Sequence, residues 1–188
     1  MNQTSRHPRL LDAADAALLV IDVQEKFRAV VQGFDRMVAG CIKLVKTFQY
    51  LQLPIWVTEQ YPKGLGETVP ELKEVLDATP PLEKTAFSSY GCQGIPELIT
   101  ESRARSILIC GIETHVCVNQ TVHDLLAAGY RVHLAIDAID SRHAINREIA
   151  LKKMEQSGAV LTTTEMAAFE LLVDAKNKKF KEVQALYK

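Results

Sequence analysis

The stretch Ser106-Ile-Leu-Ile-Cys-Gly-Ile-Glu-Thr-His-Val-Cys-Val, residues 106–118, decides the fold class of this chain. An apolar run, 106–110, leads through a glycine into a segment with the residue types of a helix start. Thr114 is a good N-cap residue, and Cys117 follows three residues later, in the expected first turn. Free backbone N–H groups and the helix dipole at such a place favour thiolate over thiol. The stretch therefore predicts a strand–turn–helix unit with Cys117 as a nucleophile, against the commoner role of a cysteine as a small core residue.

Strand-like and helix-like segments alternate along the rest of the chain. The predicted strands are mostly near-continuous apolar runs, suited to burial on both faces, and cover residues 16–22, 54–58, 82–86, 105–110, 130–136 and 159–163. The predicted helices cover residues 37–51, 114–128, 144–156 and 165–174, with a last amphipathic turn or two at 180–187. Because such alternation gives parallel, right-handed βαβ units, we expect a three-layer α/β/α fold with a mostly parallel sheet. We assign residues 16–188 to one domain and residues 1–15 to an N-terminal extension.

Composition and charge narrow the class of protein. The chain has 188 residues, of which 47% are hydrophobic and 24% charged, which excludes disorder and suits one globular domain. A formal net charge of −1 gives no basic field for nucleic acid and no polybasic membrane patch. No apolar run approaches the roughly 20 residues of a membrane helix, and the segment 1–11 lacks the apolar region of a secretory signal. We expect a cytoplasmic protein; a short organellar presequence stays open as an alternative.

Four cysteines in a chain of this size indicate a reducing compartment rather than a disulfide framework. Cys41 lies on the apolar stripe of a predicted helix and Cys110 within a predicted strand, so core packing explains both. Cys92 lies in a loop after residue 84, where it could approach a site at the strand ends. No spacing typical of a metal site is found, so we expect neither metal nor cofactor.

Two charged residues end predicted strands and are candidates to join Cys117. Asp22 follows the apolar run 16–21, and Lys84 lies in a shorter strand-like segment. In an open parallel sheet, ligands bind outside the carboxyl ends of the strands, so a carboxylate, an ammonium and a thiol at three such ends can converge. Taken singly, Asp22 as a helix cap and Lys84 as a solvated charge are the simpler interpretations.

Asp22, Lys84 and Cys117 with their surroundings resemble the isochorismatase-like cysteine hydrolase superfamily, which includes nicotinamidases and carbamoylsarcosine amidases. Longer motifs are similar to the isochorismatase domain-containing protein 2 subgroup: Asp22-Val-Gln-Glu-Lys-Phe, Val57-Thr-Glu-Gln-Tyr-Pro-Lys-Gly-Leu-Gly, Thr68-Val-Pro-Glu-Leu, Cys110-Gly-Ile-Glu and Phe180-Lys-Glu-Val-Gln. The resemblance extends from about residue 16 to the C-terminus. It implies a six-stranded sheet with strand order 3-2-1-4-5-6.

The resemblance also implies a division of chemical roles. Cys117 would attack an electrophilic carbon to give a thioester, and Asp22 would take the thiol proton, protonate the leaving group and later activate water. Lys84 would hold Asp22 ionised and stabilise the thiolate. Backbone N–H groups at the helix start would bind the oxyanion, beside a cis peptide that maps to Ile112–Glu113.

Departures from the relatives narrow the chemistry. Metal-dependent nicotinamidases carry an Asp-x-His arrangement after the second strand, whereas here residues 58–64 contain no histidine. True isochorismatases lack the cysteine that this chain has. We therefore predict a metal-independent cysteine hydrolase acting on a small amide or related acyl substrate. Two alternatives stay open: a non-catalytic partner-binding protein on the same scaffold, and a thiol-redox protein in which Cys92 resolves Cys117.

Surrounding residues complete the predicted site and surface. The pocket candidates, which follow the strands of the site or lie in the loop 61–66, are Gln24, Phe27, Glu59, Tyr61, Phe87 and Tyr90. The histidines that compete for a Cys–His dyad are expected to be surface or partner-satisfied residues: His115, His123, His133 and His143. We expect self-association into a homo-oligomer, a dimer or larger, through apolar residues of the late helices that include Phe169, Leu172 and Phe180.

Overall fold

The computed structural model describes residues 6–76 and 79–188. Residues 1–5 of the predicted N-terminal extension lie outside the described residues. Within the described part of the chain, no helix is long and apolar enough to cross a membrane.

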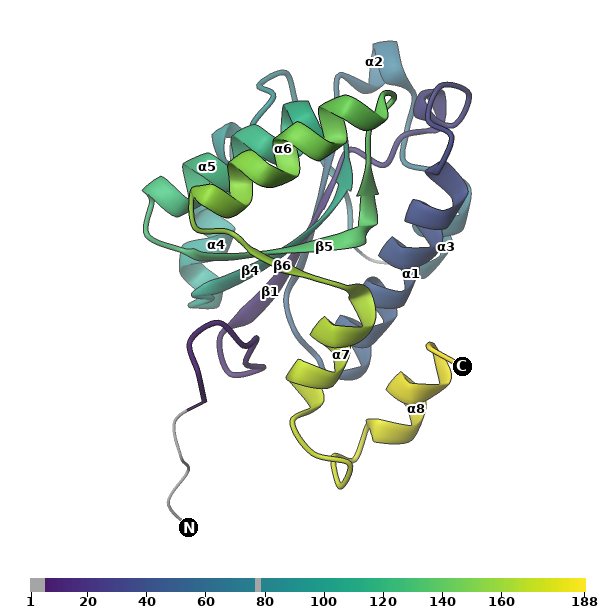
Figure 1. Cartoon of the computed structure of the whole chain (residues 1–188). Helices are drawn as coiled ribbons and strands as arrows, with labels where there is room; N and C mark the ends of the chain where they lie inside the picture. The colour runs from purple at the N-terminus through teal and green to yellow at the C-terminus, as the bar shows by residue number, and fades with distance from the viewer. Residues whose placement is uncertain (1–5, 77–78) are drawn as a thin grey trace.

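A single parallel sheet forms the centre of the molecule (Figure 1). Its strands are β1 (Ala16–Ile21), β2 (Ile55–Gln60), β3 (Leu82–Lys84), β4 (Ser106–Ile112), β5 (Arg131–Asp140) and β6 (Val160–Thr162). The spatial order is β3-β2-β1-β4-β5-β6, and every neighbouring pair is parallel. The predicted fold class and strand order are confirmed.

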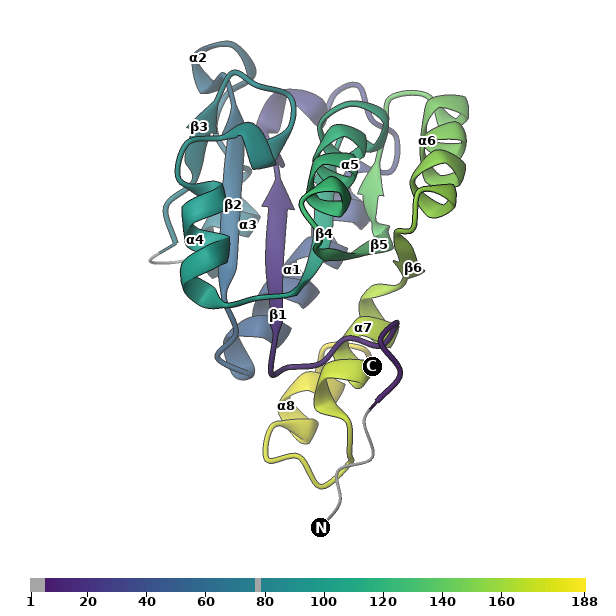
Figure 2. The same cartoon turned by 90° about the vertical axis from the view of Figure 1, so that its left-hand side faces the viewer.

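Helices cover both faces of this sheet (Figure 2). One face packs against α1 (Phe34–Tyr50), α3 (Pro70–Leu76) and α7 (Thr164–Leu172), and the other against α4 (Ile95–Ser102), α5 (Asn119–Ala127) and α6 (Ala144–Gln156). The short helices α2 (Pro62–Leu65) and α8 (Phe180–Ala185) lie outside these layers. Alternate residues of β1 enter opposite cores, Leu18 and Val20 on the α1 side and Leu19 and Ile21 on the α5 side. Each such fully buried side chain stabilises the fold by about 1.5–3 kcal/mol.

Most predicted elements are present, with differences at their ends. The helix 144–156 has the predicted bounds, whereas β5 continues to Asp140, four residues beyond the prediction. The helices α3 and α4 were not predicted. Each has seven or eight residues and too few apolar positions to give a clear period. Both begin with or just before a proline, which suits the first turn of a helix.

Gly111 allows β1 and β4 to approach closely just before the predicted catalytic residues. It pairs with Ile21 and has φ +116°, and a Cβ at this position would lie 2.1 Å from the Ile21 carbonyl oxygen. No side chain fits there, and only glycine adopts this backbone conformation readily. The close approach brings Asp22, the residue after Ile21, next to the segment that leads to Cys117.

Two predictions about individual residues are wrong. His133, expected to be exposed or partnered, lies buried in β5, and neither ring nitrogen has a hydrogen-bond partner among the described residues. Burial, and then the charge of Arg131, lower the pKa of His133 to about 4. Leu172, expected on an exposed oligomer surface, is buried against Val183, and Phe180 is half-buried in the same small cluster.

Candidate active site

Asp22, Lys84 and Cys117 lie together at the carboxyl ends of β1, β3 and β4. The Nζ atom of Lys84 lies 2.6 Å from Oδ2 of Asp22, and each side chain is only 1% exposed. Cys117 is 7% exposed, and its thiol lies near enough to the same carboxylate for the negative charge of Asp22 to raise its pKa. Residues separated by up to 95 positions in the sequence thus form one buried group because the three parallel strands end at the same edge of the sheet.

The Lys84 ammonium is fully partnered inside the protein. Besides Asp22, it donates to Oε1 of Gln60 at 2.8 Å and to the carbonyl oxygens of Phe87 at 3.1 Å and Ala86 at 3.3 Å. A buried charge is tolerated only with such a set of partners. Gln60 was not predicted as a site residue. Its place at the end of β2, beside β3, is a signal that could have indicated it.

Thr58 fixes Asp22 from the neighbouring strand. The Asp22 backbone is in the left-handed region, with φ 53°, and its N–H donates to the Thr58 carbonyl at 3.0 Å. The Thr58 hydroxyl donates to Oδ1 of Asp22 at 2.8 Å. Asp22 therefore accepts from Thr58 on one oxygen and from Lys84 on the other. Thr58 was also missed, because an isolated threonine carries no sequence signal of such a role.

Burial dominates the protonation of this group. It raises the pKa of Asp22 above the usual range, although Lys84, Cys117 and Thr58 all act in the opposite direction. Burial, and then the negative charge of Asp22, raise the pKa of Cys117 to about 12, against a smaller lowering by Lys84. The lowering of the Cys117 pKa that the helix start was expected to give is outweighed here by burial and by the charge of Asp22. A raised pKa favours the thiol form of Cys117, and its causes are the exclusion of water and the neighbouring carboxylate.

The start of the Cys117 helix also differs from the prediction. Residues Thr114–Val118 form a π-helical turn that continues into α5, and such turns are frequent at functional sites. Thr114 does not cap this helix; its hydroxyl donates to the Asp140 carbonyl at 2.9 Å instead. The hydroxyl of Thr121 donates to the Cys117 carbonyl at 2.7 Å and so fixes the turn from within α5.

The peptide bond between Ile112 and Glu113 is cis. It lies between β4 and the π-helical turn, two positions before His115. Oε1 of Glu113 accepts from the backbone N–H of Arg142 at 3.1 Å and from its Nε at 2.9 Å. The Glu113 carboxylate is thereby held by Arg142 on the segment that follows β5.

Gln24 and Glu59, two of the pocket candidates, are buried, and their side chains form hydrogen bonds that hold backbone segments together. Gln24 accepts from the Gln60 N–H at 2.8 Å and donates to the carbonyls of Gln60 and Gly66. Oε1 of Glu59 accepts from both the N–H and the hydroxyl of Thr68, at 2.6 and 2.7 Å. Both residues hold the loop that contains α2 against the end of the sheet.

The four aromatic candidates divide into two pairs. Phe27 packs against the core on the α1 side, and Tyr90 packs edge-to-face on Tyr130 with ring centroids 6.2 Å apart. Tyr61 and Phe87 are 54% and 53% exposed and flank Lys84, whose carbonyl accepts from the Tyr61 N–H at 2.9 Å. A hollow of about 330 Å³ lies here, lined by Tyr61, Pro62, Lys63, Glu83, Lys84 and Thr85.

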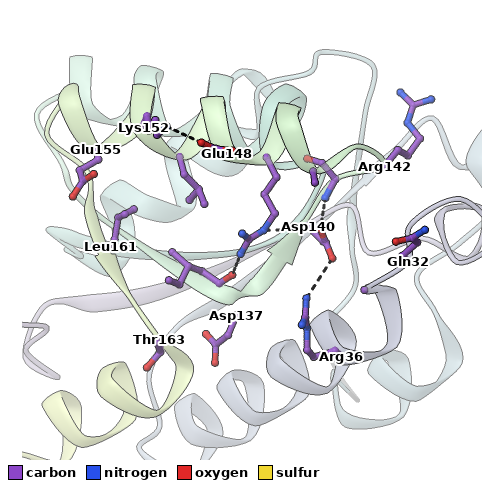
Figure 3. A pocket seen from close by; sticks show the side chains of 16 residues that line it. Gln32, Arg36, Asp137, Asp140, Arg142, Glu148, Lys152, Glu155, Leu161 and Thr163 are labelled. Atoms are coloured by element: carbon purple, nitrogen blue, oxygen red, sulfur yellow. Dashed lines mark hydrogen bonds and ion pairs between the residues drawn. The ribbon is translucent and has the colours of Figure 1, made fainter.

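A larger hollow, of about 880 Å³, lies at the ends of β5 and β6 between α6 and the start of α1 (Figure 3). Its lining mixes arginines with carboxylates and includes Arg36, Arg147, Asp140 and Glu148. Asp22, Lys84 and Cys117 do not line it. Its size therefore does not make it the candidate active site, although Asp140 connects it to the π-helical turn.

Other chemical groups near the site have partners of their own. Nδ1 of His115 lies 3.1 Å from the Ser141 hydroxyl, and both ring nitrogens of His123 are hydrogen-bonded. The Cys92 thiol lies 3.6 Å from the carbonyl oxygens of Glu83 and Gln93. Across residues 6–76 and 79–188, no three His, Cys, Asp or Glu side chains gather as a metal site would require.

The strand order is that of a doubly wound α/β sheet, with polar side chains gathered at the carboxyl ends of its strands. The sequence model of the isochorismatase domain family matches residues 16–166, and the chain belongs to this family. It is 43% identical over 176 residues to isochorismatase domain-containing protein 2 of Xenopus laevis, covering 94% of this chain and 85% of that protein.

Two solved structures place the fold among known proteins. A structure described as the MAR1 ribonuclease of Caenorhabditis elegans superposes with a TM-score of 0.88 at 43% identity, over 94% of this chain and 91% of that one. The YcaC protein of Escherichia coli, described as an octameric hydrolase of unknown specificity, gives a TM-score of 0.89 at 26% identity, over 98% and 91% of the two chains. The family and its hydrolase neighbours support a hydrolase.

Proposed function

We propose that this protein is a metal-independent cysteine hydrolase that cleaves a small amide or a related acyl substrate through a thioester on Cys117. The observation that carries the proposal is the buried contact of 2.6 Å between Lys84 and Asp22, with the Cys117 thiol near enough to the same carboxylate for the charge of Asp22 to raise its pKa. A nucleophile, a base and a compensating charge are the parts that acyl transfer needs.

In the first half-reaction the Cys117 sulfur attacks the carbonyl carbon while its proton passes to Asp22. The C–S bond forms, and the carbonyl π electrons move to oxygen. Collapse of the tetrahedral intermediate breaks the bond to the leaving amine, which takes the proton from Asp22. The products of this half are the free amine and a thioester.

In the second half-reaction water attacks the thioester and gives a proton to Asp22. The C–S bond then breaks, the acid product leaves, and the proton returns from Asp22 to the Cys117 sulfur. Lys84 stays an ammonium throughout and offsets whichever anion is present. The oxyanion would be bound by backbone N–H groups between the Ile112–Glu113 peptide and the π-helical turn, as the family resemblance implies.

The size of the substrate follows from the low exposure of the three proposed catalytic residues, taken as whole residues. Asp22 is fully buried, and Lys84 and Cys117 are 5% and 7% exposed. Only a small acyl group reaches such a thiol, and we propose that it enters beside the exposed rings of Tyr61 and Phe87. These two aromatics are the pocket candidates that stay in the proposed substrate site.

The test is a screen of the purified protein against small aliphatic and aromatic amides, with mass spectrometry of Cys117 for an acyl adduct. RNA belongs in the panel because the Caenorhabditis elegans neighbour is described as a ribonuclease. We expect amide turnover and an adduct that is lost in Cys117→Ala and kept in Cys110→Ala, since Cys110 is a fully buried strand residue. Asp22→Asn should retain the thiol and lose turnover, because an amide cannot accept the proton.

Three outcomes would contradict the proposal. Turnover of RNA alone would make it a nuclease, and turnover that survives Cys117→Ala would remove the covalent step. No turnover of any compound, with a Cys92–Cys117 disulfide after peroxide treatment, would favour the redox alternative. No turnover and no disulfide would favour the non-catalytic partner-binding protein.

We also propose that the single domain 16–188 forms a homo-oligomer in the cytoplasm. The Escherichia coli neighbour is described as octameric, and apolar side chains at 37–61% exposure lie on α6 and α7: Ile145, Ile149, Met166 and Phe169. All four cysteines are free thiols, in keeping with a reducing compartment. Sedimentation as a monomer at micromolar concentration would contradict the assembly.

A further inference from the structure

A chain of hydroxyl groups connects the Asp22 carboxylate to the helical turn that holds Cys117. At one end the Thr58 hydroxyl donates to Oδ1 of Asp22 at 2.8 Å, and the Ser89 hydroxyl lies 3.1 Å from the Thr58 oxygen. A hydroxyl has one hydrogen to donate. Since Thr58 gives its hydrogen to the carboxylate, Ser89 must be the donor to Thr58.

Ser89 also makes the contact at the other end of this series of hydrogen bonds. Its backbone N–H donates to the Thr121 hydroxyl at 2.8 Å, and Thr121 donates in turn to the Cys117 carbonyl at 2.7 Å. Every donor in this sequence of contacts has one acceptor, and the direction of each bond is fixed. One residue of the loop after β3 therefore contacts both the partner of the base and the partner of the nucleophile's backbone.

Burial makes this arrangement rigid. Thr58, Ser89 and Thr121 are all completely buried, and a buried hydroxyl that loses its partner is costly. A fully satisfied polar network in a dry interior holds one geometry. The neighbouring Ser88 shows the contrast, because its buried hydroxyl has no hydrogen-bond partner within the described residues.

We propose that Thr58 and Ser89 are positioning residues that set the proton affinity of Asp22 and keep it in register with Cys117. The proposal rests on the proposed function, in which Asp22 is the base. Thr58 holds Oδ1 while Lys84 holds Oδ2, so the carboxylate cannot rotate away from the thiol. Ser89 bonds both Thr58 and Thr121, and Thr121 bonds the carbonyl of Cys117, so Ser89 fixes the distance between Thr58 and the turn that holds Cys117.

Few ionisable groups face Asp22 besides its direct partners. Lys84 approaches from β3, Cys117 from the π-helical turn, and Cys92 lies within range of the Asp22 charge from the segment before α4. Glu59, the neighbour of Thr58 in β2, is bound to Thr68. The Thr58 hydroxyl is thus a neutral donor whose loss alters Asp22 without changing the charge of the site.

The test measures the alkylation of Cys117 by iodoacetamide as a function of pH, followed by mass spectrometry of the full chain. Only the thiolate reacts, and at acid pH the reaction stops because Asp22 is already protonated and cannot take the thiol proton. Thr58→Val removes the donor to ionised Asp22, so we expect the midpoint of this acid limb to rise by about one pH unit. Thr58→Ser should restore the midpoint of the unmodified protein.

Matched controls separate positioning from a general loss of packing. Thr162→Val removes a buried strand hydroxyl outside the site, and Ser88→Ala removes a buried hydroxyl next to Ser89; neither should move the midpoint. Ser89→Ala should move it in the same direction as Thr58→Val, by a smaller amount, because it acts through Thr58.

The outcomes are distinct from those of the substrate screen, since alkylation needs no turnover. A shift in Thr58→Val that Thr58→Ser reverses supports the proposal even if no amide is hydrolysed. An unmoved midpoint in folded Thr58→Val overturns it, as does an equal shift in Thr162→Val. If Thr58→Val does not fold, Ser89→Ala replaces it as the test. An unchanged midpoint of the acid limb in Ser89→Ala would then overturn the proposal.

Discussion

Replacing Lys84 with Met tests whether the buried ion pair is the electrostatic centre of the site. The change removes the ammonium at similar side-chain length and leaves Asp22 without its cation in a place that is 1% exposed. Breaking a buried pair on one side costs about 3–5 kcal/mol. Asp22 limits this cost by taking up a proton, because the lowering of its pKa by Lys84 is lost.

Because Asp22 takes up a proton, the loss of folding stability in Lys84→Met depends on pH. A folded-state pKa raised above the unfolded value of 3.8 gives stability that is present at low pH and lost as pH rises. Keeping Asp22 neutral on folding costs about 1.4 kcal/mol for each pH unit above that value. The largest loss of folding free energy from a neutral Asp22 is therefore about 1.6 kcal/mol at pH 5 and about 5.7 kcal/mol at pH 8. We expect Lys84→Met to lose roughly 2–3 kcal/mol more stability at pH 8 than at pH 5.

Urea unfolding at both pH values, at one fixed protein concentration, measures this difference. The single tryptophan, Trp56, is 7% exposed within the core on the α5 side and reports unfolding by fluorescence. The double variant Asp22→Asn with Lys84→Met removes both charges, so its penalty should not depend on pH and should be smaller than the sum of the single penalties. Equal penalties for Lys84→Met at pH 5 and pH 8, or additive single penalties, would refute the reasoning.

Three further changes have expected outcomes. Gly111→Ala should abolish folding or cost more than about 3 kcal/mol in urea unfolding, since its Cβ would meet backbone at 2.1 Å, whereas Gly129→Ala, with open space around it, should cost about 1 kcal/mol. His133 has its pKa lowered to about 4, so stability should fall by about 3 kcal/mol as pH drops from about 6.5 to 4; His133→Leu should flatten this slope and leave stability at pH 7 at least as high. His115→Gln should leave the alkylation rate of Cys117 nearly unchanged, while a slowed rate would make the histidine its charged partner.

The layered fold and the meeting of three distant residues were predictable from the sequence. Near-continuous apolar runs and helical spacing mark the strands and helices, and the carboxyl ends of parallel strands share one edge of the sheet. Asp22 and Lys84 stand at those ends in the sequence itself. The order of the strands needed the family resemblance, because alternation alone permits several orders.

The hydroxyl partners of the site were not predictable in the same way. Thr58, Ser89 and Thr121 have neither a periodic position nor a charged side chain, and their roles depend on register and on loop course. Gln24 and Glu59 were placed in a pocket on the strength of neighbouring motifs, yet their side chains bind backbone. A polar residue beside a site is as well suited to holding a loop as to contacting a substrate, and only the contacts distinguish the two.

The raised pKa values of Asp22 and Cys117 have one physical origin, and it gives the lysine its role. Releasing a proton from either residue to water creates a buried anion, and burial penalises that ionised form in both cases. Passing the proton from sulfur to the carboxylate changes nothing in net charge: the group holds one anion beside the Lys84 ammonium before and after. A dry site therefore resists titration by solvent while permitting the internal transfer that nucleophilic attack needs. The helix start, which favours thiolate over thiol, is less important than this balance, in which Lys84 offsets the carboxylate at rest and the thiolate during attack.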